Sequence, residues 1–429
     1  MVRVSPSLYK PRTAKRIKDA FARKGIYRVG TIQGYADAIL KEKGVEVVDP
    51  MTYLYPPAPE WVPPEDIPDN WLAKRPAVED VREKKKVWHV HRLSAFTEGM
   101  QQACLLTKSQ LFTGLPPAIN DLVGKYRVSD QDDEAKRQIL ASQVWDNTRE
   151  KLPKRFDLEN LDWVFRREYG IPENKSSLIL LNGFLQMAQA MNEEFPELYT
   201  ERLLVYEPQF STFYKYKEDN IHMACKFKAG VMGSRPLTPL GDSALVEASK
   251  EHTPFDMYPI SPLVDLQEQE VLSTKETHGF LRPNSSVRCC YPQLTLNVFP
   301  GKLLHMDKTA QPFSFLNTFA VAVEEARRRF GPSAGVLKEP VTILNINCSP
   351  LTFNFLVVQL NTLDFTSDNG IKNFVWSDSA NHLIRKTLCK PWLHSKRKYG
   401  PPKLWDYNPQ VFEKFLAMYL YNFASAKPS

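Results

Sequence analysis

V341TILNINCSPLTFNFLVVQLNTLDF365, a stretch near the C-terminus, decides the fold of this chain. It contains two β-rich runs, Val341–Ile346 and Phe353–Leu360, whose β-branched and large apolar residues favour strands. The second run is almost continuously apolar, which is typical of a strand buried on both faces. We therefore expect a β-sheet at the centre of the fold.

Helical patterns lie on both sides of this stretch, and further strands precede it. Apolar residues recur at helical spacing in several segments, and charged or Gly-Pro ends mark their limits. The expected helices are 94–111, 118–123, 133–145, 178–192, 311–330 and 409–423. The runs 203–206, 210–216 and 222–227 are expected to be strands, with a strand pair around the turn at 218–220. Helices that lead and strands that mix with helices afterwards predict an α+β fold, with a mixed β-sheet core flanked by helices.

The composition is that of a globular protein. The chain has 429 residues, of which 43% are hydrophobic and 24% are charged. No stretch approaches the roughly 20 apolar residues that a membrane helix needs, so we expect no membrane partner. The six cysteines form no C-x-x-C pair. They are interpreted as reduced thiols in a reducing compartment such as the cytosol or the mitochondrial matrix.

Three regions are predicted along the chain. Residues 1–49 form a basic N-terminal arm, because residues 1–28 hold nine basic residues and one acid. Such an arm is either a mitochondrial transit-like segment or a retained arm that binds RNA, and both interpretations stay open. Residues 50–87 form an extended strap rich in proline and aromatic residues, and residues 88–429 form the globular body.

Catalytic motifs are absent from the sequence. It contains no Walker-type phosphate loop, no G-x-G-x-x-G and no G-x-S-x-G. His89 and His91 would share one face of a strand, but no further ligands join them, so neither a metal nor a cofactor is expected. Asp364 and Asp368 lie among turn-forming residues, which predicts a loop that caps itself. An enzyme stays an alternative only if these acids, Asp378 and His382 converge in a pocket.

One constellation stands out, between Asp378 and Asp406. This segment has no acid but seven cations, with Trp392, Tyr399 and Trp405 among them. Cations neutralise phosphates, and exposed rings stack on unpaired bases, so we expect contact with RNA. Three prolines are expected to keep the segment irregular. The predicted RNA-binding residues, from this segment, the basic arm and a smaller basic run, are Arg3, Lys10, Arg12, Lys15, Arg16, Lys84, Lys85, Lys86, Arg92, Arg385, Lys386, Lys390, Trp392, Lys396, Arg397, Lys398, Tyr399 and Lys403.

Six runs of the sequence carry a family resemblance. In order, they begin at Gly99 (GMQQACLLTKSQL), Gly114 (GLPPAINDLV), Tyr258 (YPISPLVDL), Phe355 (FLVVQLNTLDF), Gly370 (GIKNFVWSDS) and Phe412 (FEKFLAMYL). Together they resemble the family of mitochondrial large-subunit ribosomal proteins numbered thirty-seven, over roughly residues 90–423. Its sister family, once numbered thirty in the small-subunit series, is also called programmed cell death protein nine.

The resemblance implies a structural role in the large subunit of the mitochondrial ribosome, in the matrix. It implies contacts with ribosomal RNA and with other mitochondrial ribosomal proteins, and pairing with the sister protein as a pseudo-dimer. The family has no catalytic residues to carry over, so no enzyme is expected. The alternatives are the sister family with its link to cell-death signalling, a non-ribosomal matrix interaction protein, or an enzyme.

Overall fold

The computed structural model describes residues 39–46, 85–90, 95–142, 150–151, 169–271, 288–299, 309–332, 334–388, 392–393, 398–399 and 403–424. The chain divides into two compact units, Met1–Val81 and Arg82–Ser429. In the first unit, the described residues 39–46 form an exposed helical turn that ends at Gly44. The second unit carries the sheets and the remaining helices.

A seven-stranded mixed sheet lies at the centre of the second unit. Its strand order is β2-β13-β12-β11-β10-β8-β5. The strands are β2 (Ser109–Thr113), β5 (Arg202–Tyr206), β8 (Ala229–Gly233), β10 (Tyr291–Val298), β11 (Val336–Cys348), β12 (Thr352–Thr362) and β13 (Asn373–His382). Strands β10 and β11 are parallel, as are β13 and β2, whereas the other neighbours are antiparallel. The predicted mixed sheet and α+β class are confirmed.

The predicted burial of the second run on both faces is also confirmed. In β12, Phe353, Phe355 and Val357 join one hydrophobic cluster, while Leu356, Val358 and Leu360 join another on the opposite face. Side chains alternate between the faces of a strand, so an unbroken apolar run serves two cores at once. β12 can do this because it is paired on both edges, with β11 and β13.

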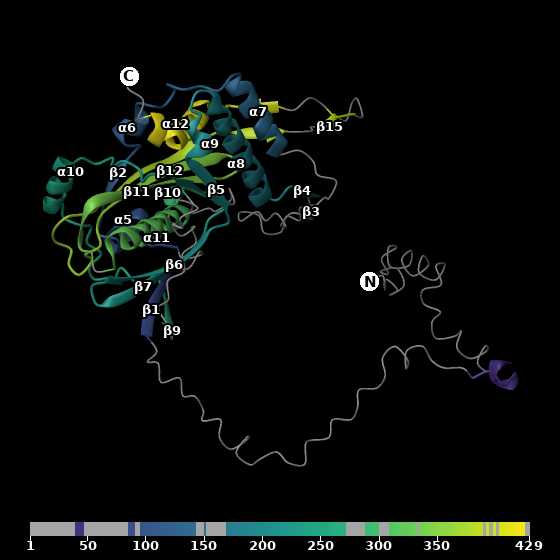
Figure 1. Ribbon diagram of the computed structural model, residues 1–429, viewed down its shortest axis with the longest axis horizontal. Coiled ribbons are helices and arrows are strands. Elements are labelled where there is room, and N and C mark those ends of the chain that lie inside the picture. The colour runs from purple at the N-terminus through teal and green to yellow at the C-terminus, as the bar shows by residue number, and fades with distance from the viewer. Residues whose placement is uncertain are drawn as a thin grey trace, which may run out of the picture. The chain divides into compact units, whose positions relative to one another are not determined.

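Helices cover one face of this sheet (Figure 1). They are α6 (Pro117–Asn120), α7 (Gln131–Ser142), α8 (Glu173–Gln189), α9 (Glu197–Thr200) and α12 (Gln410–Ala424), with the 3-10 turn η2 (Ala190–Glu193) between α8 and α9. The apolar stripe predicted for the C-terminal helix, which includes Phe412 and Phe415, is buried throughout. That stripe packs with Phe184 of α8 and Phe353 of β12, so the helical layer and the sheet share one aromatic core.

The other face carries α11 (Ala310–Phe330) and α5 (Gly99–Leu106), and beyond α11 lies a second sheet (Figure 1). The order of this sheet is β6-β7-β1-β9, formed by β6 (Gln209–Tyr216), β7 (Asp219–Lys226), β1 (Lys85–Val90) and β9 (Gln267–Val271). Because α11 lies between two sheets, its residues 310–326 are all buried. It ends where predicted, at Gly331, whose φ of 89° suits a residue without a Cβ.

Several predicted elements need correction. The helix expected over 94–111 ends at Leu106, and Leu111 lies in β2, because Lys108 has a φ of 49° that breaks the helix. The predicted strand pair around the turn at 218–220 is confirmed as β6 and β7, whereas the run 203–206 joins β8 in the larger sheet. A short helix, α10 (Ser243–Ala248), begins directly after Gly241 and Asp242. The Asp242 side chain caps this helix by accepting a hydrogen bond from the Leu245 N–H. Strands β8, β10 and β13 were not predicted.

A helix that crosses a membrane must be long and apolar. None of the helices in the described ranges is both long enough and apolar enough to cross a bilayer.

Candidate nucleic-acid interface

Two short antiparallel strand pairs lie within the acid-free segment 385–405, which we call the C-terminal arm. Near its base, β14 (Lys386–Leu388) pairs with β17 (Lys403–Trp405). Farther out, β15 (Trp392–Leu393) pairs with β16 (Lys398–Tyr399). In Figure 1, β15 lies well to one side of the stacked sheets and helices. The sequence prediction of an irregular segment is therefore wrong where these ladders form.

The prolines explain why the arm is paired in two short pieces. Pro391 lies between β14 and β15, and Pro401 and Pro402 lie between β16 and β17. A proline has no backbone N–H to donate, so it interrupts a ladder without preventing pairing on either side of it. The described residues Lys386, Trp392, Lys398, Tyr399 and Lys403 of the arm lie on paired strands.

The predicted RNA-binding residues are described to different extents. The Arg385 side chain is 82% exposed, and its Nη1 is 3.7 Å from the Asp406 carboxylate. Lys386, Trp392, Lys398, Tyr399 and Lys403 are strand residues of the arm. Arg3, Lys10, Arg12, Lys15, Arg16, Lys84, Arg92, Lys390, Lys396 and Arg397 lie outside the described residues. The structure thus brings the C-terminal residues together on one arm.

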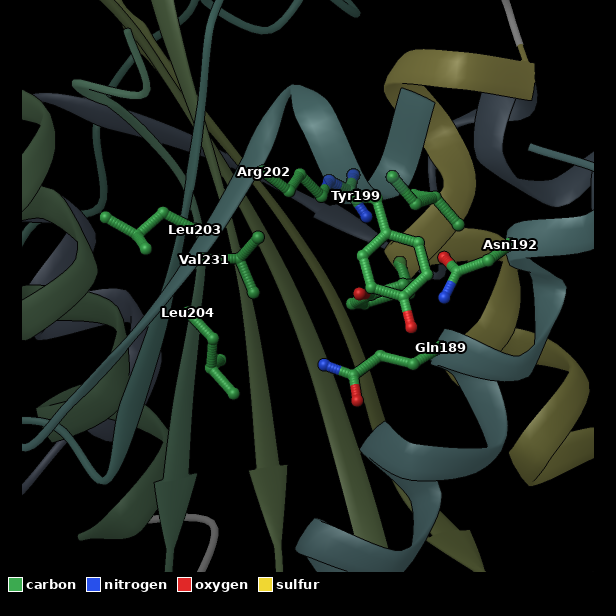
Figure 2. A pocket seen from close by; sticks show the side chains of 9 residues that line it. Gln189, Asn192, Tyr199, Arg202, Leu203, Leu204 and Val231 are labelled. Carbon is green, nitrogen blue, oxygen red and sulfur yellow. The ribbon is translucent and has the colours of Figure 1, made fainter. Parts of the chain in front are cut away.

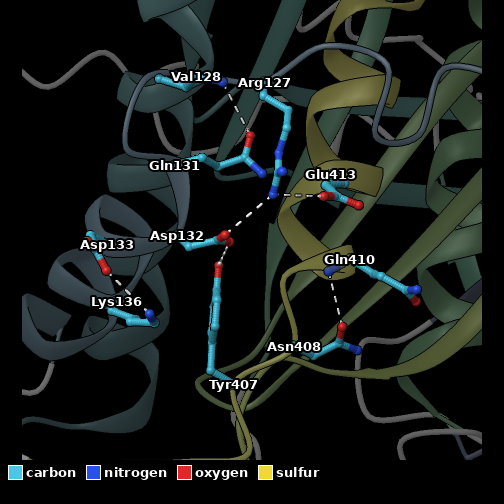
Figure 3. Close-up of polar contacts among 10 residues, drawn as sticks. All are labelled: Arg127, Val128, Gln131, Asp132, Asp133, Lys136, Tyr407, Asn408, Gln410 and Glu413. Atoms are coloured by element: carbon cyan, nitrogen blue, oxygen red, sulfur yellow. Dashed lines mark hydrogen bonds and ion pairs between the residues drawn. The ribbon is translucent and has the colours of Figure 1, made fainter.

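A polar network anchors the helical layer beside the arm's base (Figure 3). The Tyr407 hydroxyl, two residues after β17, donates to Asp132 of α7 over 3.3 Å. Arg127 Nη2 lies 3.4 Å from both Asp132 and Glu413, and so joins α7 to α12. Burial raises the pKa of Tyr407, and the neighbouring Asp132 raises it further. The residues that follow β17 are therefore held to α7 and α12 by hydrogen bonds and ion pairs.

The smaller basic run lies in different surroundings. Lys85 and Lys86 are exposed residues of β1, which is an inner strand of the second sheet, between β7 and β9. Lys86 Nζ lies 2.9 Å from Glu268 and 5.1 Å from the centre of the Trp88 ring. Glu218 and Asp219 lie beside the two lysines. Their charge is therefore offset by nearby acids.

His89 faces another histidine from the neighbouring strand. Its Nδ1 lies 3.2 Å from Nδ1 of His222, whose Nε2 is 2.8 Å from the Ser211 hydroxyl. The ring of Phe213 stacks on His222 at 4.3 Å. Burial, together with the nearby His89, lowers the pKa of His222 to about 4. No group of three or more His, Cys, Asp or Glu in the described ranges is placed to hold a metal ion.

This histidine pair predicts a pH dependence of stability. The folded pKa of His222, about 4, lies below the value of 6.5 for a free histidine. The unfolded chain therefore binds the extra proton first, and stability is lost as pH falls from 6.5 towards 4. Because the ring is only half-buried, water screens the effect, and we expect a loss of about 1 kcal/mol. Urea unfolding from pH 7 to pH 4 should show a shallower decline in His222→Gln than in the wild type. An equal decline in both proteins would contradict the prediction; His382→Gln, at an exposed site, is the control.

The acids of the enzyme alternative do not converge. Asp378 lies at the end of the sheet where β13 pairs with Phe355, and it accepts a 2.7 Å bond from Lys414. Asp364 follows the opposite end of β12, roughly 20 Å of strand away. Asp364 Oδ1 accepts hydrogen bonds from the N–H and hydroxyl of Thr366, and the buried Lys372 donates to the carbonyls of Asp368 and Gly370. The predicted self-capping loop is confirmed.

The segment around Tyr258, which carries part of the family resemblance, forms an apolar loop on the surface. Four of its side chains are 40–88% exposed: Phe255, Tyr258, Ile260 and Val264. Clustered exposed apolar side chains are characteristic of surfaces that other proteins cover. The sequence signal was present in YPISPLVDL, but the same residues are equally consistent with a core.

Comparison with known proteins gives one consistent result. No protein-family model matches the chain. It is 31% identical to the large ribosomal subunit protein mL37 of Rattus norvegicus over 77% of this chain and 74% of that protein. The mL37 of Mus musculus is 29% identical over the same shares, and that of Gallus gallus is 27% identical over 82% of this chain and 79% of its own length. The resemblance noted in the sequence is confirmed: this chain belongs to the mL37 family of large ribosomal subunit proteins.

Proposed function

We propose that this chain is a structural component of the large subunit of the mitochondrial ribosome, acting in the matrix in support of mitochondrial translation. Membership of the family indicates which assembly the chain joins, because the relatives are named as large ribosomal subunit proteins. Ribosomal RNA and other ribosomal proteins are then its partners. The single observation that carries the contact with RNA is the acid-free arm, which projects from a near-neutral body.

The arm supports this function through its charge and its shape. It presents seven cations between Asp378 and Asp406 without an intervening acid. Like charges held on one short segment repel one another unless a polyanion faces them. Phosphate groups would meet Arg385, Lys386, Lys396, Arg397, Lys398 and Lys403, and Trp392 and Tyr399 would stack on unpaired bases. The basic N-terminal residues would add a second contact of the same kind.

We also propose that the protein has no catalytic role. Two observations support this. The acids that the enzyme alternative required lie at opposite ends of β12, and those described have structural partners such as Lys414 and Thr366. The five described cysteines are buried free thiols, and burial raises the pKa of Cys104, Cys225 and Cys348. A thiol whose pKa is raised by burial is a poor nucleophile.

The apolar loop around Tyr258 supports a protein neighbour. Its exposed Phe255, Tyr258, Ile260 and Val264 would be covered in the assembled subunit, and the sister protein of the proposed pseudo-dimer is our candidate for the covering partner.

Sedimentation tests the assembly directly. Tagged protein from a mitochondrial lysate is run on a gradient at low magnesium, which separates the subunits. We expect co-migration with the large subunit that survives moderate salt. Protein that stays at the top of the gradient would exclude a stable ribosomal role and favour a signalling or matrix interaction role.

Charge reversal tests the arm. We expect the triple variant Lys396→Glu, Arg397→Glu, Lys398→Glu to reduce incorporation into the large subunit, increasingly so as salt rises, because each neutralised phosphate adds to the salt dependence. Gradient fractions at three salt concentrations measure the effect. A triple reversal at Lys125, Lys215 and Lys338, which are exposed residues outside both the N-terminal and the C-terminal arm, is the control. Equal incorporation of the arm variant and the wild type at every salt concentration would exclude the arm as an RNA contact.

A further inference from the structure

An arginine on β5, Arg202, is partly buried, and part of its guanidinium has no hydrogen-bond partner. Nε and Nη1 of Arg202 are inaccessible to solvent and unbonded within the part of the chain that the structure describes. The guanidinium carbon lies 4.5 Å from the centre of the Tyr419 ring and 4.6 Å from that of Phe423. These rings hold the cation by cation–π attraction, and Tyr419 is also a hydrogen-bond partner of the guanidinium, but neither residue carries a carboxylate. An unpaired buried charge is costly, so the site suits an anion.

The arginine borders a pocket of about 170 Å³, which we call the Arg202 pocket. Figure 2 shows the Tyr199 ring and the Gln189 and Asn192 amides on one side and Leu204 and Val231 on the other. The lining therefore combines one cation and hydrogen-bonding groups with an apolar wall. Because the volume is that of one side chain, the pocket suits a short aliphatic stem that ends in a planar anion.

The surroundings of the pocket favour a protein over a nucleic acid. Residues 189–204, which supply most of its lining, contain four acids: Glu193, Glu194, Glu197 and Glu201. Such a rim repels a polyanion. A single carboxylate inside the pocket would be attracted by the guanidinium, and basic residues beside it would meet the acidic rim.

The position on the sheet indicates how a partner would approach. β5 is the last strand of the described seven-stranded sheet and pairs with β8 on one side. An outer strand offers backbone donors and acceptors to an added strand. Leu203 and Tyr206 are 37% and 62% exposed along it.

We propose that the Arg202 pocket is a receptor for one carboxylate side chain, supplied by a protein segment that pairs along β5 and carries basic residues on either side of that carboxylate. The inference stands apart from the ribosomal role and is testable on the purified full-length chain. Burial lowers the pKa of Arg202 to about 10, which leaves the guanidinium charged at neutral pH.

Calorimetry with a designed peptide tests the proposal. The probe is the acetylated, amidated pentapeptide Lys-Val-Glu-Val-Lys, and its matched control has Gln in place of Glu. We expect the Glu peptide to bind at millimolar concentration and the Gln peptide to bind at least 10-fold more weakly. Arg202→Met should weaken Glu-peptide binding at least 10-fold, because it removes the cation. Arg235→Met removes a nearby arginine that is 76% exposed, and it should bind like the wild type.

Thermal unfolding separates loss of the site from loss of the fold. Arg202→Met removes an unpaired buried charge and keeps an apolar stem, so its melting temperature without peptide should equal or exceed that of the wild type. If that variant does not fold, the Glu and Gln peptides on the wild type still decide. The proposal is overturned if both peptides bind equally, if the Glu peptide shows no heat at millimolar concentration, or if Arg202→Met and Arg235→Met behave alike. Displacement of the peptide by a short single-stranded RNA would make the pocket a phosphate site instead.

Discussion

Phe184→Ala is expected to lower the free energy of unfolding by about 3–5 kcal/mol, because it leaves a cavity where α8 and α12 pack on the sheet. Phe184 of α8 is fully buried. Its ring stacks on Phe353 of β12 at 5.4 Å and meets Phe412 and Phe415 of α12 edge-on at 5.0 and 5.7 Å. The Phe184 ring therefore fills the space between α8, α12 and the sheet.

Urea unfolding of the full-length chain measures this effect. Tyr206→Ala removes an aromatic ring that is 62% exposed, and this control should change stability by no more than about 0.5 kcal/mol. Phe184→Leu keeps most of the volume and should cost less than about 1.5 kcal/mol. A loss below about 1 kcal/mol in Phe184→Ala would mean that the helical layer is not packed on the sheet through this ring.

Gln359→Leu is expected to cost about 2–4 kcal/mol, although it places an apolar residue in a buried strand. Gln359 of β12 is fully buried, and its Oε1 accepts hydrogen bonds of 2.8 Å from the N–H groups of both Leu240 and Gly241. Its Nε2 donates to the Gly241 carbonyl and to Asn361. Leucine would leave two backbone donors without a partner, and that desolvation exceeds the gain from a larger apolar surface.

The position of Gly241 makes the same contact tight. A Cβ on this residue would lie 2.8 Å from Cε2 of Phe374, so the loop at 240–241 approaches the sheet as closely as a backbone can. The loop therefore has little room to move and find other partners in Gln359→Leu. Chemical denaturation measures the change, with Gln269→Leu at an exposed position of β9 as the matched control. A loss in Gln359→Leu as small as in the control would contradict the proposed role of the amide.

The local sequence pattern predicted the secondary structure correctly in the elements that are deeply buried. The unbroken apolar run of β12 predicted a central strand, and α11 and α12 begin and end within one or two residues of their predicted limits. In these elements, the periodicity, the residue propensities and the end signals all indicate the same structure, and the tertiary contacts agree with it. The strand at Leu111 is the opposite case. Its apolar residues also fitted a helix, and the left-handed Lys108 that ends α5 carries no sequence signal.

The candidate sites show the same division. The acid-free cations of the arm and the family resemblance are visible in the sequence, because charge and motif are properties of consecutive residues. The two strand pairs of the arm and the neutralisation of Lys86 by Glu268 are not visible in it. The predicted three-region division of the chain and its RNA-binding residues remain predictions.

The sequence by itself determined the α+β class, the position of the central strand, the acid-free run of cations between Asp378 and Asp406, and the family. It did so because each depends on the order of residues within short windows. Only the tertiary structure decided that α11 lies between two sheets, that His89 faces His222, and that Arg202 is enclosed by Tyr419 and Phe423. These partners lie far apart along the chain. Which of them meet depends on the strand order of two sheets, and no local pattern encodes that order.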